Sequence, residues 1–194
     1  MVTRQLASDS SKESRLRGVS IPNKIAADIL RYKKSGAVLD LGVGPGRNAL
    51  FLASSGFDVT GIDIDSNAIG LFRQKATDAD IAVKAELADI REYLIAAEYD
   101  VIISTSVLHF VADPERVIQN MKTHTKEGGL NVISVFTKEN PDKRFAHLFE
   151  QNELRQYYDD WEILQYKEYL TDLEQHDDLK PHRHFVAEIM ARRG

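Results

Sequence analysis

The sequence predicts an α/β fold: a doubly wound, mostly parallel sheet with helices on both faces. Short apolar segments alternate with amphipathic helical segments along most of the chain, as expected where crossover helices join parallel strands. A glycine-rich run at residues 42–46 directly follows the first apolar segment, and Asp63 ends the second. Ligands of such sheets bind at the carboxyl ends of the strands, so these residues mark the expected site.

Apolar periodicity and glycine signals define the elements of the first half. A helical stretch is expected over Pro22 to Tyr32, where apolar side chains recur at helical spacing. Gly56 is expected to end the first crossover helix. The expected order is a strand at 37–41, a helix at 47–55, a strand at 57–62, a helix at 66–77 and a weaker strand at 81–87.

The second half begins with a strongly predicted strand at 100–104, whose continuous β-branched run is typical of a strand buried on both faces. Asp113 and Pro114 predict a helix start, because an N-cap followed by proline suits the first helical turn. The glycine pair at 128–129 is expected to end this helix. The remaining expected elements are a strand at 130–136, a helix at 152–159 and strands at 161–169 and 184–192.

Composition excludes several classes of protein. The 194 residues hold 25 Lys and Arg against 30 Asp and Glu, a net charge of −5, whereas a dedicated nucleic-acid binder needs a basic surface. The absence of cysteine excludes disulfide scaffolds, cysteine-based zinc sites, iron–sulfur clusters and a cysteine nucleophile. The histidines near the carboxyl terminus have no evident third ligand beside them, so no metal site is expected.

We expect one domain over residues 1–194. No apolar run approaches the roughly 20 residues that span a membrane, and no apolar segment follows Arg4 as in a signal peptide. The expectation is therefore a cytoplasmic protein without membrane contact, as a monomer or homodimer. Residues 1–24 are polar and basic, and we expect them to form an N-terminal lid over the site or a tail.

The glycine-rich turn indicates the kind of ligand. Glycines within residues 42–46 let the backbone approach a ligand closely, and the following helix directs free N–H groups toward it. Asp63 is placed to accept both hydroxyls of a ribose, and Asp40 lies within reach of a cationic amino group. Neither carboxylate suits a pyrophosphate, and Arg47 stands where the dinucleotide fingerprint has its third glycine. A ribose plus an ammonium without phosphates describes S-adenosylmethionine.

Residues 38–48, Val-Leu-Asp-Leu-Gly-Val-Gly-Pro-Gly-Arg-Asn, resemble the first motif of class I S-adenosylmethionine-dependent methyltransferases. Val43 departs from the cysteine often found there, at a position that contributes mainly its backbone. The resemblance covers about residues 37–193 and implies a seven-stranded Rossmann-like methyltransferase sheet. Further segments resemble the tellurite-resistance (TehB-like) branch in particular: 46–48, 104–108, 120–121, 128–129, 153–158, 161–162 and 190–193.

The resemblance implies a role for each residue that matches a family motif. Asp40, Gly42 and Gly44 would hold the methionine part of the cofactor, while Arg47 and Asn48 would begin the helix beneath it. Asp63 would bind the ribose, and Ile64 and Ile90 would pack on the adenine. Asp89 would meet the adenine amino group, and the competing interpretation is a helix N-cap, a role that one Asp can combine with the first. Ser104 and Thr105 would end the fourth strand under the sulfonium.

The segment expected to hold the methyl acceptor departs from the tellurite branch. That branch has a His-Arg pair soon after the sixth strand, whereas residues 171–176 read Thr-Asp-Leu-Glu-Gln-His. Basic groups return at His182, Arg183 and His184, so these and His109 are candidates to orient or deprotonate an acceptor. A packed or solvated side chain is the competing interpretation at each position. The expected acceptor is a small molecule, either a tellurite- or selenite-type oxyanion or another soft nucleophile, and an anion needs no general base.

Alternatives to a small-molecule methyltransferase stay open. A cofactor-binding module without catalysis, acting as a sensor or partner, would keep the same glycines and Asp63. An NAD-dependent enzyme would bind NAD and not S-adenosylmethionine. Methyltransferases that act on nucleic-acid amino groups usually carry an Asn/Asp-Pro-Pro-aromatic motif after the fourth strand, whereas residues 104–107 contain no proline, so we expect no nucleic-acid partner.

Overall fold

The computed structural model of the chain describes residues 20–173 and 182–194. The chain divides into two compact units, Met1–Tyr93 and Leu94–Gly194. The expectation of a single domain stays a prediction. Most of the expected lid or tail at residues 1–24 lies outside the described residues.

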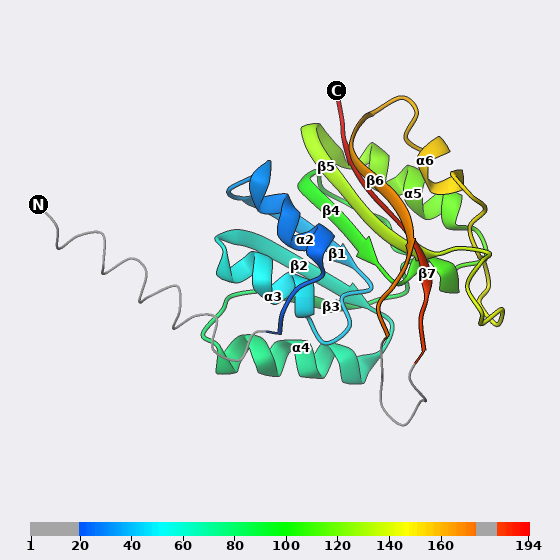
Figure 1. The fold of residues 1–194 in the computed structure, drawn as a ribbon. Helices are drawn as coiled ribbons and strands as arrows, with labels where there is room; N and C mark the ends of the chain where they lie inside the picture. The colour runs from blue at the N-terminus through cyan, green and yellow to red at the C-terminus, as the bar shows by residue number, and fades with distance from the viewer. Residues whose placement is uncertain (1–19, 174–181) are drawn as a thin grey trace, which may run out of the picture. The chain divides into compact units, whose positions relative to one another are not determined.

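The first unit is built on three parallel strands, in the order β3-β2-β1 (Figure 1). Helix α4 begins where the Asp65 carboxylate accepts the Asn67 N–H at 2.8 Å, and it buries Ile69, Phe72 and Ala76 along one face. The unit contains α2 (Lys24–Asp28), η1 (Ile29–Arg31), β1 (Gly36–Leu41), α3 (Arg47–Ser54), β2 (Phe57–Asp63), α4 (Ser66–Asp78) and β3 (Lys84–Leu87).

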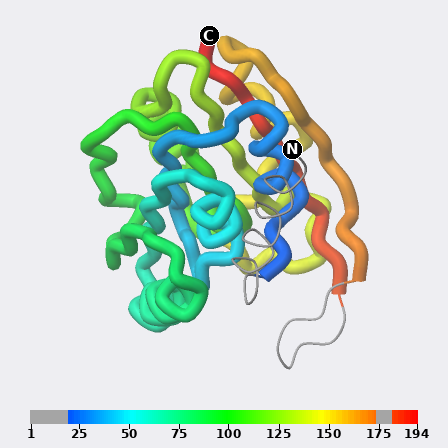
Figure 2. Tube along the Cα trace, turned by 90° about the vertical axis from the view of Figure 1, so that its left-hand side faces the viewer, coloured from blue at the N-terminus to red at the C-terminus, as the bar shows by residue number. Residues whose placement is uncertain are grey.

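The second unit pairs β4 with β5 in parallel, and β7 lies antiparallel between β5 and β6. Figure 2 shows the last two strands, β6 in orange and β7 in red, running side by side. The unit contains β4 (Tyr99–Thr105), η2 (Leu108–Phe110), α5 (Pro114–Thr123), β5 (Thr125–Phe136), α6 (Glu153–Gln156), β6 (Glu162–Leu170) and β7 (Phe185–Arg192).

The strands form a seven-stranded mixed sheet in the order β3-β2-β1-β4-β5-β7-β6. The pairings of β1 with β2, β2 with β3 and β4 with β5 are parallel, and the antiparallel pairings are confined to the β7 strand and its two neighbours. The predicted fold class, a mostly parallel doubly wound sheet, is confirmed. Within the described residues, no helix has the length and apolar character needed to cross a membrane.

The predicted end of the second unit's long helix is wrong. Helix α5 ends at Thr123, and β5 begins at Thr125, so the glycine pair at 128–129 lies inside a strand. A Cβ on Gly129 would approach the carbonyl oxygen of Lys126 to 2.7 Å and that of Asp100 to 3.1 Å. The glycine therefore allows a close backbone approach within the sheet and does not end a helix.

Two further predicted boundaries are also wrong. Strand β3 begins at Lys84 and not at residue 81, because the Ile81 N–H donates to the Ala76 carbonyl and closes the turn that ends α4. Helix α6 covers only Glu153–Gln156 of the predicted 152–159. The residues after it form tight i→i+3 turns, such as the bond from the Tyr158 N–H to the Arg155 carbonyl.

Candidate functional site

The glycine-rich turn connects β1 to α3 at the carboxyl end of the β1 strand. The Gly42 and Val43 N–H groups both donate to the Ile62 carbonyl at 2.8 Å, which ties the turn to β2. Gly46 caps α3 with φ +86°, and a Cβ there would lie 2.2 Å from a ring carbon of Phe72. Gly44 also has a positive φ, +54°, but a Cβ there would meet no atom within 4 Å. The absence of a side chain at Gly46 therefore makes room for the Phe72 ring, whereas the absence of a side chain at Gly44 leaves the backbone uncovered.

Asp63 ends β2 and holds this turn with both carboxylate oxygens. Its Oδ2 accepts the Gly44 N–H at 2.8 Å, and its Oδ1 accepts the Asp65 N–H at 2.9 Å. The side chain is half-buried, and the next residue, Ile64, is 62% exposed. A carboxylate with two acceptor oxygens has further lone pairs, so these bonds leave it able to accept from ligand hydroxyls.

Asp40, near the end of β1, is only 2% exposed. Burial first, and then the nearby charge of Asp63, raise the pKa of the Asp40 carboxyl from its usual 3.8 to about 8. A buried carboxyl of this kind is mostly protonated at neutral pH, and a cation placed beside it would favour the ionised form. The environment of Asp40 therefore suits an ammonium group.

The remaining predicted cofactor residues of the first unit lie as follows. Arg47 is exposed at the start of α3. Asn48 is 5% exposed, and its Oδ1 accepts the Asn23 N–H at 2.9 Å, so its side chain fixes the residue before α2. This use of Asn48 is not evident in the glycine-rich motif, because its partner lies 25 residues away.

Asp89 begins a turn after β3. Its Oδ1 accepts the Arg91 N–H at 2.9 Å, and both carboxylate oxygens pair with the Arg91 guanidinium. The hydrogen bond from that side chain is the largest of the effects that lower the Asp89 pKa. The residues that follow form a turn and not a helix, so Asp89 caps no helix, and Ile90 beside it is half-buried.

In the second unit, β4 ends at the predicted pair Ser104, which is buried, and Thr105, which is half-buried. The next residue, Ser106, has φ +60°, a left-handed conformation that is uncommon without glycine. Its N–H donates to the Ser134 carbonyl of β5 at 2.9 Å. This strained turn directs the chain into η2, which carries His109.

His109 is 1% exposed, and its ring stacks on Phe136 with the centroids 4.0 Å apart. The Phe136 N–H donates to His109 Nδ1 at 3.4 Å, so in the neutral ring the proton lies on Nε2. Burial, and to a smaller extent the nearby charge of His184, lower the pKa of His109 to about 3. The ring is therefore neutral at physiological pH and offers an Nε2–H donor.

His184, just before β7, stacks against Phe136 with the centroids 4.3 Å apart and the planes 8° apart. His182 meets the His184 ring edge-on at 4.7 Å, and Arg183 between them is exposed. The structure thus brings together three of the four predicted acceptor-side residues and leaves Arg183 at the surface. No group of three or more metal-ligating side chains occurs among the described residues.

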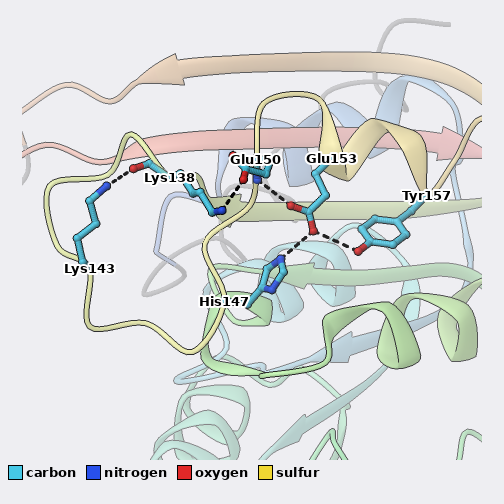
Figure 3. A network of polar contacts seen from close by, with 6 residues as sticks. All are labelled: Lys138, Lys143, His147, Glu150, Glu153 and Tyr157. Carbon is cyan, nitrogen blue, oxygen red and sulfur yellow. Dashed lines mark hydrogen bonds and ion pairs between the residues drawn. The ribbon is translucent and has the colours of Figure 1, made fainter.

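Two further polar groups of the second unit have no site role predicted from the sequence. Asn140 is fully buried, and its Oδ1 lies 3.1 Å from His184 Nδ1. Glu153 accepts from His147 Nε2 at 2.8 Å, from the Tyr157 hydroxyl at 3.2 Å and from the Glu150 N–H at 2.7 Å (Figure 3). These contacts join the loop after β5 to α6 and to the residue before β7, and residue spacing alone does not predict them.

The His147 N–H donates to the His109 carbonyl at 3.1 Å, so the loop after β5 is also tied to η2. Figure 3 shows this loop held at further points, with Lys143 donating to the Lys138 carbonyl and Lys138 paired with Glu150. The loop is therefore attached both to α6, through Glu153, and to the segment that carries His109.

Comparison with known proteins gives the family. The family model described as "Tellurite resistance protein TehB" matches residues 22–184. A curated relative, the probable S-adenosyl-L-methionine-dependent methyltransferase TehB of Haemophilus influenzae, is 40% identical over 147 residues, which are 73% of this chain and 51% of that protein. A ubiquinone biosynthesis O-methyltransferase of Rickettsia akari is 30% identical over 118 residues, 61% of this chain and 47% of that protein.

Comparison with solved structures gives the same family. The crystal structure of TehB from Haemophilus influenzae matches with a TM-score of 0.82 and 33% identity, covering 89% of this chain and 62% of that one. Magnesium protoporphyrin IX methyltransferase from Synechocystis with bound S-adenosylmethionine matches with a TM-score of 0.68 at 20% identity, covering 88% and 76%, and shows a shared fold. The chain spans about half the length of the curated relatives it matches first. The resemblance drawn from the glycine-rich motif is confirmed: the chain belongs to the TehB family.

Proposed function

We propose that the chain is an S-adenosylmethionine-dependent methyltransferase that acts on a small molecule. The observation that carries the proposal is the pair of carboxylates at the glycine-rich turn. Asp40 is buried where a cation would stabilise its charge, and Asp63 holds the Gly44 backbone while keeping acceptor capacity. The names of the relatives support the same activity.

In this proposal most of the cofactor contacts come from the first unit. Asp40 receives the ammonium of the methionine part, and Gly42 and Gly44 let the backbone approach it. Asp63 receives the ribose hydroxyls, and the exposed Ile64 side chain packs on the adenine. The other proposed contacts are Arg47 and Asn48 at the start of α3, Asp89 and Ile90 after β3, and Ser104 and Thr105 at the end of β4.

When bound, the cofactor supplies a methyl group attached to a positively charged sulfonium sulfur. That sulfur is a good leaving group, because it departs as a neutral thioether. The task of the chain is therefore to position the acceptor in line with that methyl group and to exclude water. A general base is needed only for an acceptor that carries a proton at neutral pH.

The proposed acceptor is a tellurite- or selenite-type oxyanion or another soft nucleophile such as a thiol. The family's description supports the oxyanion. His109, held neutral with its proton on Nε2, would orient the acceptor as a hydrogen-bond donor, because so weak a base does not deprotonate it. His182, Arg183 and His184 are the proposed groups that attract or deprotonate an acceptor.

The proposal includes a cytoplasmic monomer or homodimer without a nucleic-acid partner. The net charge of −5 supports the last point, because phosphate contacts require a basic surface.

The test is release of S-adenosylhomocysteine by the purified chain with selenite, tellurite or 2-mercaptoethanol as the acceptor. The expected result is product release with at least one of these probes, which Asp63→Ala abolishes or weakens. Tight binding of S-adenosylhomocysteine without methyl transfer to any probe would instead support a binding module, and stabilisation by NAD alone would support a hydride-transfer enzyme.

A further inference from the structure

Asn140 is a fully buried amide in the turn that follows β5. Its backbone N–H donates to the Thr137 carbonyl at 3.0 Å, and its side-chain Nδ2 donates to the Asp142 carbonyl at 3.2 Å. A buried amide is costly unless it is hydrogen-bonded, so these bonds account for both donor groups. The Asn140 side chain is therefore held in one orientation.

That orientation determines which nitrogen of His184 carries a proton. A carbonyl oxygen cannot donate, so the bond to Asp142 identifies Nδ2 as the amide nitrogen and turns Oδ1 toward His184. Oδ1 can only accept, so His184 Nδ1, at 3.1 Å, is the donor. In the neutral ring the lone pair then lies on Nε2.

The His184 backbone is fixed as firmly as its ring. Its N–H donates to Thr171 Oγ1 at 3.0 Å, and its carbonyl accepts the Thr171 N–H at 2.8 Å. The next carbonyl, of Phe185, accepts the Thr137 N–H at 3.0 Å. With Phe136 stacked on one face, the ring is placed by contacts from three segments of the second unit.

We infer that Asn140 is a positioning residue for methyl transfer, which keeps His184 as the Nδ1–H tautomer so that Nε2 receives the proton of a protonated acceptor. This inference rests on the proposed function. As the acceptor atom bonds to the methyl carbon, the carbon–sulfur bond breaks and its electron pair stays on sulfur. The acceptor's proton passes to His184 Nε2, which gives a methylated acceptor, a neutral thioether and a protonated imidazole.

The tautomer can be measured without any substrate. Nitrogen-15 spectra of the histidine side chains at pH 8 should show His184 as Nδ1–H in the parent chain and in Asn140→Asp, which keeps an acceptor oxygen. Asn140→Leu removes the acceptor, so His184 should shift toward Nε2–H, the form that free imidazole side chains favour. The inference is overturned if the parent ring is Nε2–H, or if Asn140→Leu leaves its tautomer unchanged.

Asn131→Leu is a matched control for the effect of losing a buried amide. Asn131 is also fully buried in the second unit, where it donates to Thr125 Oγ1 at 2.6 Å and accepts from the Tyr158 hydroxyl at 2.9 Å. Its replacement should lower the stability of the chain and leave the His184 tautomer as in the parent. A tautomer change in this control would show that general loosening, and not the Asn140 contact, is responsible.

Kinetics test whether the reaction uses this tautomer. The thiol of 2-mercaptoethanol is protonated near neutral pH. With this acceptor, Asn140→Leu should lower kcat by roughly tenfold or more and leave the KM for S-adenosylmethionine unchanged. Asn140→Asp should restore kcat. An anionic acceptor such as selenite should be much less affected. An equal loss with both acceptors would overturn the proton-transfer role. If the parent chain methylates neither probe, the proposed function fails, while the spectra still decide what Asn140 does to His184.

Discussion

At the scale of single residues, the two carboxylates of the glycine-rich turn differ in their surroundings. Asp63 accepts two backbone N–H groups, whereas Asp40 is buried near the end of β1 and has a raised pKa. Burial disfavours the ionised form of a carboxyl, and a nearby cation favours it. Asp63 is thus suited to neutral hydroxyl donors and Asp40 to a cation.

Asp63→Ala should weaken binding of S-adenosylhomocysteine at least tenfold. The change removes hydrogen bonds to a charged group, each worth about 1.5–3 kcal/mol, and also frees the Gly44 N–H that the carboxylate holds. Calorimetric titration measures the affinity. Asp58→Ala is the control, because Asp58 is on the same strand in an exposed ion pair with Lys84 and should leave binding unchanged. Equal affinity in the parent chain and Asp63→Ala would place the ribose elsewhere.

Asp40 should make both stability and ligand binding depend on pH. Its pKa in the folded chain is about 8 against a usual 3.8, so between these values the folded state holds a proton that the unfolded state has lost. The contribution of Asp40 to the free energy of unfolding therefore decreases as the pH rises through this window. Melting temperatures of the parent chain and Asp40→Asn, measured from pH 5 to pH 8, should converge at low pH, with Asn progressively more stable toward pH 8.

The same proton links pH to the ligand. A ligand with an ammonium group needs the ionised form of Asp40, so the affinity for S-adenosylhomocysteine should rise as the pH approaches 8, by up to roughly tenfold per unit. Calorimetry in buffers of different ionisation enthalpy should detect proton release on binding at pH 7. Binding without proton release would show that the Asp40 carboxyl does not receive the cation.

The proposed cofactor residues follow from local sequence patterns, whereas the contacts around the acceptor-side histidines do not. The glycines and Asp63 follow from a local pattern of a strand, a turn and the end of the next strand. Asn140 and His184 lie 44 residues apart, and only the pairing of β5 with β7 brings their segments together. Which histidine is buried and neutral is likewise decided by tertiary packing, so the pKa of His109 is not readable from its neighbours in the chain.

At the scale of elements, two glycines of one turn should respond very differently to the same substitution. Gly46→Ala combines a left-handed backbone with a Cβ at 2.2 Å from the Phe72 ring, and should lower the free energy of unfolding by roughly 2–4 kcal/mol. Gly44→Ala carries only the left-handed strain, about 1 kcal/mol, because nothing lies within 4 Å of the new Cβ. Urea denaturation measures both, and equal losses would contradict the packing assigned to Gly46.

The loop after β5 should depend on Glu153. The Glu153 carboxylate accepts hydrogen bonds from His147, from the Tyr157 hydroxyl and from the Glu150 backbone N–H (Figure 3). Glu153→Gln replaces one carboxylate oxygen with an NH₂ group, which faces these donors and cannot accept from them. We expect a loss of about 1–2 kcal/mol of stability and faster hydrogen exchange at the Glu150 amide.

Glu150→Gln is the comparison for this loop. Glu150 pairs with Lys138 through exposed side chains, 63% and 55% accessible, so its replacement should change stability by less than about 1 kcal/mol. If it destabilises the loop as much as Glu153→Gln does, the network around Glu153 does not hold the loop.

The elements themselves show where sequence patterns mislead. The apolar run at 100–104 and the Asp113-Pro114 start correctly predict β4 and α5, because each signal is local. The glycine pair at 128–129 is indistinguishable in the sequence from a helix stop. Its real role depends on atoms of Lys126 and Asp100 that approach only when the sheet has formed.

At the scale of the whole molecule, the seven-stranded sheet and the match over residues 22–184 give the same assignment. The chain spans about half the length of the curated relatives it matches first. The expected lid or tail at residues 1–24 remains a prediction. Limited proteolysis with and without S-adenosylhomocysteine tests it. If the segment is a lid, cleavage between Arg4 and Arg17 should slow when the ligand is bound.

The most direct test of the cofactor assignment is thermal unfolding of the whole chain with and without ligands. S-adenosylhomocysteine at ~100 times its dissociation constant should add ~2.7 kcal/mol to the stability of the folded state. For a chain of this size, that raises the melting temperature by roughly 5–10 °C. S-adenosylmethionine should act in the same direction, and NAD should have no effect. No shift with either adenosyl ligand at millimolar concentration, or a shift with NAD alone, would contradict the assignment.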